Sequence, residues 1–344
     1  MRGPSRRTKE VREFILAHVS EHPKEISAFA AHQFGVTRQA ISRHLHALIE
    51  QGRLSASGTT RNRSFALCNF VEEIFHYDVH EDLAEDVLWR ESALPLLSNL
   101  KENVLDICQY GFTEMVNNVI THSGSPGMVV RVWRNALRTR IDVYDEGIGV
   151  FQKIQNDFQL RDPRHALLEL SKGKLTSDEA RHSGEGLFFT SRMFDTFRIL
   201  SGTLFFEKQA HGEHWLIDTD ENMPTTRGTN ISMEIPEDSP RILQDVFDAH
   251  AGEKPGQGFA RTHVVLGLLR HGSEKLFSRS QAKRLLSRID EFEEVVLDFN
   301  DIPVIGQAFA DEIFRVFRAE HPQVQIHCVN TTDAVEKMIA RTQA

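Results

Sequence analysis

The stretch that decides the fold is Gly111-Phe112-Thr113-Glu114-Met115-Val116-Asn117-Asn118-Val119-Ile120-Thr121-His122. Its apolar residues recur at spacings of three and four, which predicts a helix. Glu114 and Asn118 are four residues apart and therefore share one helix face. A carboxylate and an amide among apolar residues cost free energy unless they have partners. Asn118 offers the hard oxygen that Mg²⁺ prefers, and Glu114 can orient or deprotonate an attacking group.

A second stretch, Asp145-Glu146-Gly147-Ile148-Gly149, closes an alternating apolar run. The alternation predicts a strand in which Asp145 points to the same side as the apolar residues. A carboxylate there needs hydrogen-bond donors, and the amino group of adenine is a suitable one. Gly147 and Gly149 allow the chain to turn and a ligand to approach the backbone.

The third stretch is Ser183-Gly184-Glu185-Gly186-Leu187-Phe188, which begins another predicted helix. Backbone N–H groups at such a helix start can hold phosphate oxygens. A divalent-ion ligand, an adenine acceptor and a phosphate cradle together predict a pocket for an adenine nucleotide.

These stretches, in this order, resemble the N, G1 and G2 boxes of the GHKL ATPase superfamily, and the Glu114-x-x-x-Asn118-x-x-x-His122 pattern is most similar to its anti-sigma-factor kinases. The resemblance covers residues 80–236 and implies ATP and Mg²⁺ as ligands. It implies Glu114 as the catalytic acid or base, Asn118 as the metal ligand and Asp145 as the adenine acceptor. Further expected nucleotide contacts are Gly147, Gly149, Lys174, Gly184, Gly186, Leu187 and Thr229.

Charge is distributed unevenly along the chain. Residues 1–67 carry eleven Lys and Arg against five Asp and Glu, a net charge of +6. The formal net charge of the whole chain is −9, so residues 68–344 carry −15. A basic N-terminal part on an acidic body indicates an anionic partner for that part. Three widely spaced cysteines argue against a disulfide framework, and no apolar run has the length of a membrane helix. We expect a cytoplasmic protein.

The N-terminal residues 1–69 are predicted to form three helices, at 9–20, 26–34 and 38–50, followed by strands at 54–56 and 64–67. Gly35 makes a turn and Thr37 caps the third helix. This arrangement resembles a winged helix-turn-helix. Duplex DNA is the expected partner, and a winged helix used for protein contacts is the alternative. The expected DNA contacts are Arg38, Gln39, Ser42, Arg43, Arg61 and Arg63.

The middle of the chain is expected to hold a connector at 68–82, an amphipathic helix at 81–100 and a hairpin at 127–145. The polar segment 150–183 lies between the two glycine-rich stretches and is a candidate lid over the nucleotide. Lys174 in this lid could contact phosphate or remain solvated. Strands at 198–207, 213–219 and 228–235 would complete a mixed sheet.

Residues 259–344 follow a boundary rich in Pro and Gly and alternate strand and helix. They resemble the STAS-like domains of anti-sigma-factor antagonists. Residues 299–320 contain no Ser or Thr, so the phosphorylated residue of those antagonists has no counterpart there.

The predicted fold is therefore a multi-domain α/β protein: a winged helix, a GHKL α/β sandwich and a STAS-like α/β domain. The expected function is a nucleotide-controlled, DNA-binding transcriptional regulator with slow ATP hydrolysis. The alternative enzyme is a serine/threonine protein kinase acting on an antagonist-like partner, since both reactions use the same pocket. A scaffold with a degenerate pocket is less consistent with intact Glu114 and Asn118. A protein partner for the STAS-like domain and a homodimer remain open.

Overall fold

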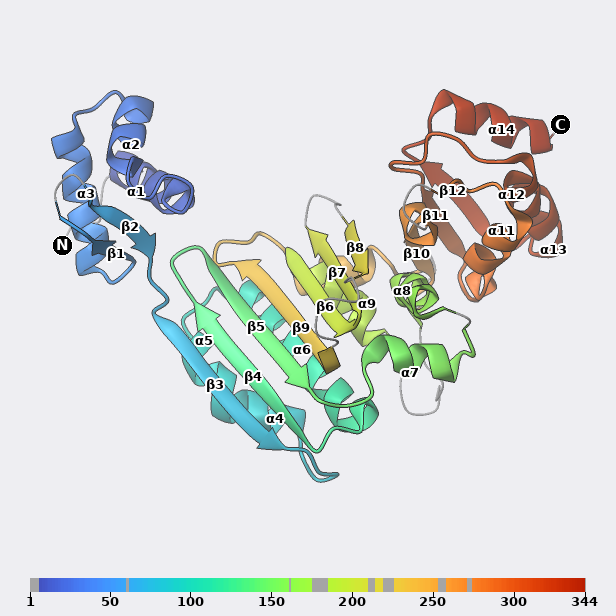
Figure 1. Cartoon of the computed structure of the whole chain (residues 1–344), viewed down its shortest axis with the longest axis horizontal. Coiled ribbons are helices and arrows are strands. Elements are labelled where there is room, and N and C mark those ends of the chain that lie inside the picture. The colour runs from blue at the N-terminus through green and yellow to red at the C-terminus, as the bar shows by residue number, and fades with distance from the viewer. Residues whose placement is uncertain are drawn as a thin grey trace.

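The computed structural model contains three β-sheets with helices packed against them (Figure 1). It describes residues 6–59, 62–160, 162–174, 185–209, 214–218, 226–252, 258–270 and 274–343. The α/β class expected from the sequence is therefore observed. No helix in these ranges is long and apolar enough to cross a membrane.

The N-terminal unit has the predicted three helices and a two-stranded antiparallel hairpin. The Thr37 hydroxyl accepts a hydrogen bond from the Ala40 N–H at 3.2 Å, and Gly35 adopts the left-handed conformation at φ 61° between the second and third helices. These residues bury a hydrophobic core of their own. The elements are α1 (Arg6–His18), α2 (Ile26–Phe34), α3 (Arg38–Glu50), β1 (Leu54–Ser57) and β2 (Ser64–Leu67).

The central sheet has seven strands in the order β3-β4-β5-β9-β6-β7-β8. The segment 68–82, expected to be a connector, instead contains strand β3 at one sheet edge, and the expected strand 198–207 divides into β6 and β7. The strands are β3 (Val71–Asp78), β4 (Gly127–Arg134), β5 (Arg138–Asp145), β6 (Thr196–Gly202), β7 (Leu204–Gln209), β8 (His214–Asp218) and β9 (Thr226–Pro236).

The expectation of a mixed sheet is wrong, because every described strand pair in the central sheet is antiparallel. The long helical connection from β5 to β6 does bring two parallel strands into one sheet. However, β9 lies between them and pairs with both in the antiparallel sense. The topology therefore separates the parallel strands.

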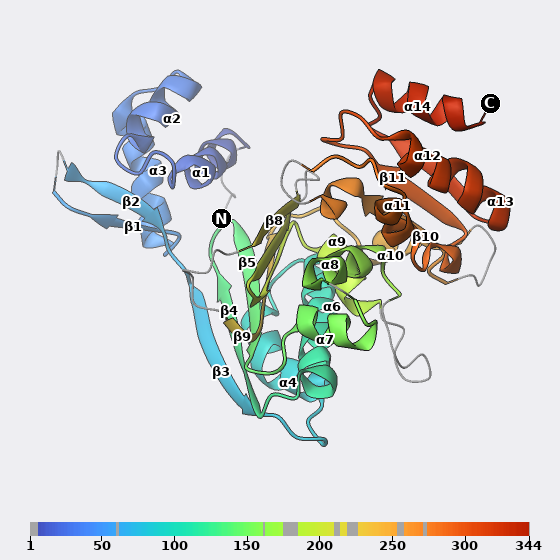
Figure 2. The same ribbon diagram turned by 45° about the vertical axis from the view of Figure 1, so that its right-hand side comes forward.

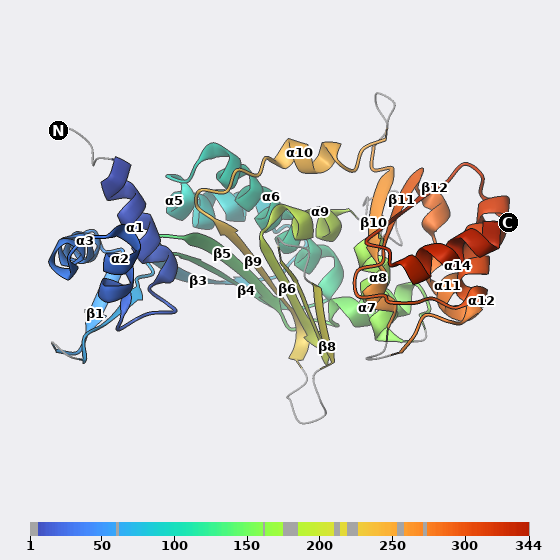
Figure 3. The ribbon, with the colours of Figure 1, turned by 90° about the horizontal axis from the view of Figure 1, so that it is seen from above.

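Helices cover one face of this sheet (Figures 2 and 3). The amphipathic helix expected at 81–100 is interrupted by a π-turn, and the segment 150–183 is not an exposed polar lid where it is described. It forms two helices, and Ala166, Leu167, Leu168 and Leu170 of the second are buried. The elements are α4 (Glu85–Leu88), η2 (Trp89–Ala93), α5 (Leu94–Leu97), α6 (Glu102–Asn118), η3 (Val119–Ser123), α7 (Val150–Asp157), α8 (Pro163–Lys172), α9 (Gly186–Met193) and α10 (Leu243–Asp248).

The C-terminal unit is a three-stranded parallel sheet with helical crossovers, close to the predicted alternation. Each pair of neighbouring parallel strands in this sheet is joined by a helical crossover. Its elements are β10 (Arg261–Val265), η4 (Leu266–Leu269), α11 (Arg279–Leu286), η5 (Ile289–Glu291), β11 (Glu294–Asp298), α12 (Gln307–Asp311), η6 (Glu312–Phe317), α13 (Arg318–Glu320), β12 (Gln325–Val329) and α14 (Asp333–Gln343).

The central and C-terminal units share one continuous hydrophobic cluster. Phe259 joins them: its ring centroid lies 4.4 Å from that of Phe188 and 5.1 Å from that of Phe189, both on α9. On its other side it lies 5.3 Å from Phe292, which precedes β11. Helix α9 therefore packs directly against the C-terminal unit.

Candidate functional site

Glu114 lies near the end of α6 and is partly buried. Burial, and then the neighbouring carboxylates of Glu85 and Glu185, raise its pKa above the usual range. A carboxylic acid tuned toward neutral pH is better suited to accept or return a proton than an ordinary one. The environment of Glu114 therefore fits an acid–base role.

Asn118 is the last residue of α6, immediately before the π-turn η3. Such turns occur often at functional sites. The amide nitrogen of Asn118 is buried and has no hydrogen-bond partner among the residues that the structure describes. Rotation of the amide by half a turn exchanges its nitrogen and oxygen, so this position can present either a donor or an oxygen ligand. The residue fits the predicted Mg²⁺ ligand in chemistry and in lacking a protein partner.

Asp145 ends β5 and is 4 % exposed. Its Oδ1 accepts a hydrogen bond from the Gly147 N–H at 2.8 Å. Burial raises its pKa, and the hydrogen bonds from the backbone N–H groups of Gly147 and Thr229 oppose that shift. The carboxylate is thus held in one orientation at the strand end, as an adenine acceptor requires.

Neighbouring atoms lie so close to the glycines around Asp145 that a side chain there would meet them. A Cβ at Gly147 would lie 2.1 Å from the Ser123 carbonyl oxygen, and one at Gly228 would lie 1.9 Å from the Asp145 carbonyl oxygen. Gly149 has φ +89°, and a Cβ there would lie 2.7 Å from the Ser201 hydroxyl. The first glycine stretch is therefore wrapped closely around the strand end.

The third stretch meets the first at Gly186. A Cβ at Gly186, the first residue of α9, would lie 2.0 Å from Oε2 of Glu114. Leu187 follows within the same helix and is partly buried. Gly184 lies outside the described residues. The structure thus brings Glu114 to the start of α9, where phosphate binding is expected.

Hydroxyl side chains join the loops by hydrogen bonds; the sequence analysis named Thr229 among them and missed Ser125 and Ser201. The Ser125 hydroxyl accepts from the Glu146 N–H at 3.1 Å, and the Thr229 hydroxyl accepts from the Val150 N–H at 2.9 Å. Ser201 donates to the Gly228 carbonyl at 2.9 Å. These bonds join residues far apart in the chain, so sequence spacing carries no signal for them.

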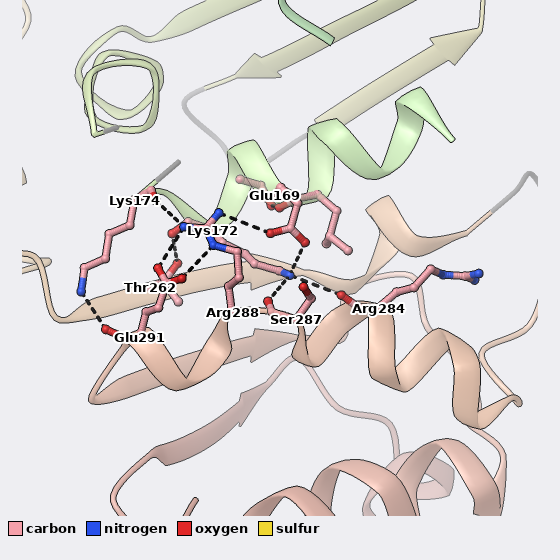
Figure 4. A network of polar contacts seen from close by, with 10 residues as sticks. Glu169, Lys172, Lys174, Thr262, Arg284, Ser287, Arg288 and Glu291 are labelled. Atoms are coloured by element: carbon pink, nitrogen blue, oxygen red, sulfur yellow. Dashed lines mark hydrogen bonds and ion pairs between the residues drawn. The ribbon is translucent and has the colours of Figure 1, made fainter. Parts of the chain in front are cut away.

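Lys174, an expected nucleotide contact, is hydrogen-bonded to the C-terminal unit. Its ammonium donates to the Glu291 carbonyl at 2.7 Å and lies 4.7 Å from the centre of the Phe292 ring. Figure 4 shows it directed toward the C-terminal unit. The contact of Lys174 with phosphate stays a prediction.

Lys172, at the end of α8, also binds the C-terminal unit. It is 1 % exposed, and its ammonium donates to Glu169 Oε1 at 2.7 Å and to the Ser287 carbonyl at 2.7 Å (Figure 4). Thr262 in β10 donates to the Lys172 carbonyl at 2.7 Å. Arg288 forms an ion pair with Glu169 at 3.6 Å. The end of α8 is therefore bonded to two parts of the C-terminal unit.

The expected DNA-contacting residues of α3 lie on its outer face. Arg38, Gln39 and Arg43 are exposed, and Ser42 is half-buried. In the hairpin, the Arg63 guanidinium lies 5.3 Å from the centre of the Phe65 ring, and Arg61 is outside the described residues. The helix thus presents two guanidinium groups and an amide together.

Within the described ranges, no group of three or more His, Cys, Asp or Glu side chains could hold a metal ion. A metal at Asn118 would depend on few protein ligands, as is usual for Mg²⁺ bound with a phosphorylated substrate.

Comparison with known proteins identifies the C-terminal unit. A family model described as a STAS-like domain of unknown function (DUF4325) matches residues 281–336, from α11 into α14. The STAS-like prediction is confirmed for that region. A search of the curated proteins found no match.

Proposed function

We propose that this chain is an ATP-binding, DNA-binding regulator. Residues 80–236 would form a GHKL-type nucleotide module, residues 1–69 a winged helix-turn-helix, and residues 259–344 a STAS-like unit for a protein partner. The observation that carries the proposal is the approach of Glu114 to Gly186, because it unites an acid–base residue with a helix start suited to phosphate.

Each residue of the pocket would have its own role in nucleotide binding or catalysis. Asp145 would accept the adenine amino group, and the glycines beside it would let the base lie against the backbone. The N–H groups at the start of α9 would hold phosphate oxygens. A bound Mg²⁺ would neutralise phosphate charge, with Asn118 as its protein ligand. Glu114 would take the proton of the attacking hydroxyl group.

That hydroxyl group can belong to water or to a serine or threonine of a partner protein. The second case makes the chain a protein kinase, and the STAS-like unit favours a protein partner over a small molecule. Incubation with radiolabelled ATP separates the two: free labelled phosphate indicates hydrolysis, and labelled protein indicates transfer.

Binding itself is tested by titrating the whole chain with non-hydrolysable analogues of ATP and GTP in Mg²⁺. Loss of one buried, oriented hydrogen-bond acceptor weakens recognition by about 10- to 100-fold. We expect that loss of ATP-analogue affinity for Asp145→Asn and a weak response to the GTP analogue from the natural chain. Asp142→Asn, on the same strand but paired with Arg140 at 2.6 Å, is the matched control. Equal affinity in all three chains would remove Asp145 from the pocket.

A further inference from the structure

A cavity lies outside the candidate nucleotide pocket and is lined by residues of α9, β7, α10 and β10. Its volume is about 450 Å³, within the range of small-molecule sites. Neither Glu114 nor Asp145 lines it. It is bounded by the last residues of α9, whereas Glu114 approaches the first residue of that helix.

Three cationic side chains from separate elements line this cavity: Arg192, Lys208 and Arg241. Backbone carbonyls hold them in place. The Lys208 ammonium donates to the Ser191 carbonyl at 2.8 Å, and Arg241 donates to the Arg192 carbonyl at 3.0 Å. Arg192 lies 3.4 Å from the centre of the Phe188 ring and donates to two further carbonyls. Carbonyl partners fix the direction of these groups without neutralising their charge.

Few carboxylates balance the three cations. Among the described residues, Asp195 pairs with Arg241 at 2.9 Å, and Asp245 lines the cavity from the exposed face of α10. The Nε atom of Arg241 is buried and lacks a hydrogen-bond acceptor in the described part of the chain. Burial, and then Arg192 and Arg241, lower the pKa of Lys208 to about 7. A bound anion would supply both the missing charge and an acceptor.

The remaining wall is largely apolar, with Leu170, Phe206, Val246 and Leu268 among its residues. Two histidines, His250 and His263, complete the lining. Burial and the adjacent Arg192 lower the pKa of His250 to about 4, so its ring is neutral near pH 7. An inorganic ion would use the cations alone, whereas an apolar body bearing an anionic group would use both kinds of surface.

We propose that this cavity is a binding site for a small organic anion, with a phosphate or carboxylate group facing Arg192, Lys208 and Arg241. The proposal stands independently of the nucleotide function. Because the cavity is walled by α9 on one side and by β10 and η4 on the other, its occupant contacts the central and the STAS-like units together. Such a ligand would stabilise the present arrangement of the two units by mass action.

Phenyl phosphate and benzoate are suitable probes, and phenol and inorganic phosphate represent the two halves of phenyl phosphate. We expect calorimetric titration of the full chain to show binding of at least one of the two anions, more tightly than of either half. The tighter of the two identifies the anionic group that the site prefers. Absence of binding by both anions at millimolar concentration would overturn the proposal.

Two variants test whether the probe anion binds in this cavity. Lys208→Met removes one cation at similar length and should weaken the bound anion about 10- to 100-fold, as expected for a lost charged hydrogen bond. Lys337→Met, on the exposed face of α14, is the matched control and should bind like the natural chain. Ala249→Trp places a large side chain in the cavity opening and should abolish binding while keeping every cation.

Competition with ADP separates this site from the nucleotide pocket. Saturating ADP should leave the affinity for the probe anion unchanged. Displacement by ADP that persists in Lys208→Met and Ala249→Trp, or natural affinity for the probe in both variants, would show that the probe binds elsewhere and would overturn the assignment.

Discussion

Two carboxylates of the candidate pocket differ because their surroundings differ. Backbone N–H groups of Gly147 and Thr229 stabilise the ionised form of Asp145 and oppose the effect of its burial. Glu114 has nearby carboxylates instead, which add to the effect of burial. Asp145 is therefore suited to remain an oriented acceptor, and Glu114 is suited to exchange a proton.

At this scale we expect Glu114→Gln to retain ATP binding, to lose turnover and to unfold at a higher temperature near neutral pH. An acid whose pKa is raised by folding costs stability at any pH above its unfolded value, because the fold disfavours the ionised form. The gain should therefore disappear as the pH falls below about 4.5, the ordinary value for glutamate. Thermal denaturation of the variant and the natural chain across this pH range measures the difference in unfolding temperature.

The control for this variant is Asp106→Asn, which removes an exposed carboxylate from the same helix. It should show no comparable pH-dependent gain. Normal turnover by Glu114→Gln would place the proton acceptor elsewhere.

At the scale of elements, two glycines meet different obstacles. A Cβ at Gly186 would approach the movable end of Glu114, but a Cβ at Gly147 would approach the fixed backbone of Ser123. We expect Gly186→Ala to change the free energy of unfolding by less than about 1 kcal/mol and to reduce turnover, because the carboxylate must shift. Gly147→Ala should destabilise the fold by about 2 kcal/mol or more.

Urea denaturation and ATP turnover of the two variants check this pair. A Gly186→Ala protein with natural turnover would contradict the functional contact between α9 and Glu114.

The buried ammonium of Lys172, which binds Glu169 and joins α8 to the C-terminal unit, gives a second prediction about the elements. Lys172→Met leaves Glu169 buried without its nearest cation and should destabilise the protein by about 3–5 kcal/mol. The double variant Lys172→Met/Glu169→Leu should recover much of that loss, since no buried charge remains at the pair. Chemical denaturation measures both. A double variant no more stable than the single one would show that the ion pair is not the source of the effect.

At the scale of the whole molecule, the N-terminal unit has its own core, with Ala136 and Leu137 of the β4–β5 turn packed against it. The central and C-terminal units share the other core. A signal from the proposed nucleotide pocket would thus have a continuous packed route to the STAS-like unit through α9 and Phe259. The central unit meets the N-terminal unit at this turn and at residues 68–70, which join β2 to β3.

We expect the full chain to bind duplex DNA with an affinity that falls steeply with salt, because Lys and Arg displace counterions from phosphates. Arg38 and Gln39 substitutions should alter sequence preference, and Arg63→Ala should weaken all sequences alike. Fluorescence anisotropy across a salt series measures both effects. Absence of binding at low salt would favour a protein-contact role for the unit.

If the nucleotide controls DNA binding, a coupling of about 1–3 kcal/mol would change DNA affinity about 5- to 150-fold. Linkage requires DNA to change the affinity for the ATP analogue by the same factor. Unequal factors, or no change in either, would contradict such control.

The sequence allowed much of this structure to be predicted, because local signals fix its elements. Periodicity and the cap at Thr37 placed the N-terminal helices, and alternation placed β5 and Asp145. Strand β3 was missed because none of its residues is buried and the strand is defined by its pairing with β4, which local pattern does not record. The positions of Lys172 and Lys174 depend on contacts with residues more than a hundred positions away.

Hydrogen exchange of the full chain, with and without a non-hydrolysable ATP analogue and Mg²⁺, tests the central claim most directly. The predicted pocket requires added protection at the end of α6, at residues 145–150, at the start of α9 and around Thr229. Protection confined to the cavity beside Lys208 or to the N-terminal unit, with these segments unchanged, would contradict the nucleotide pocket.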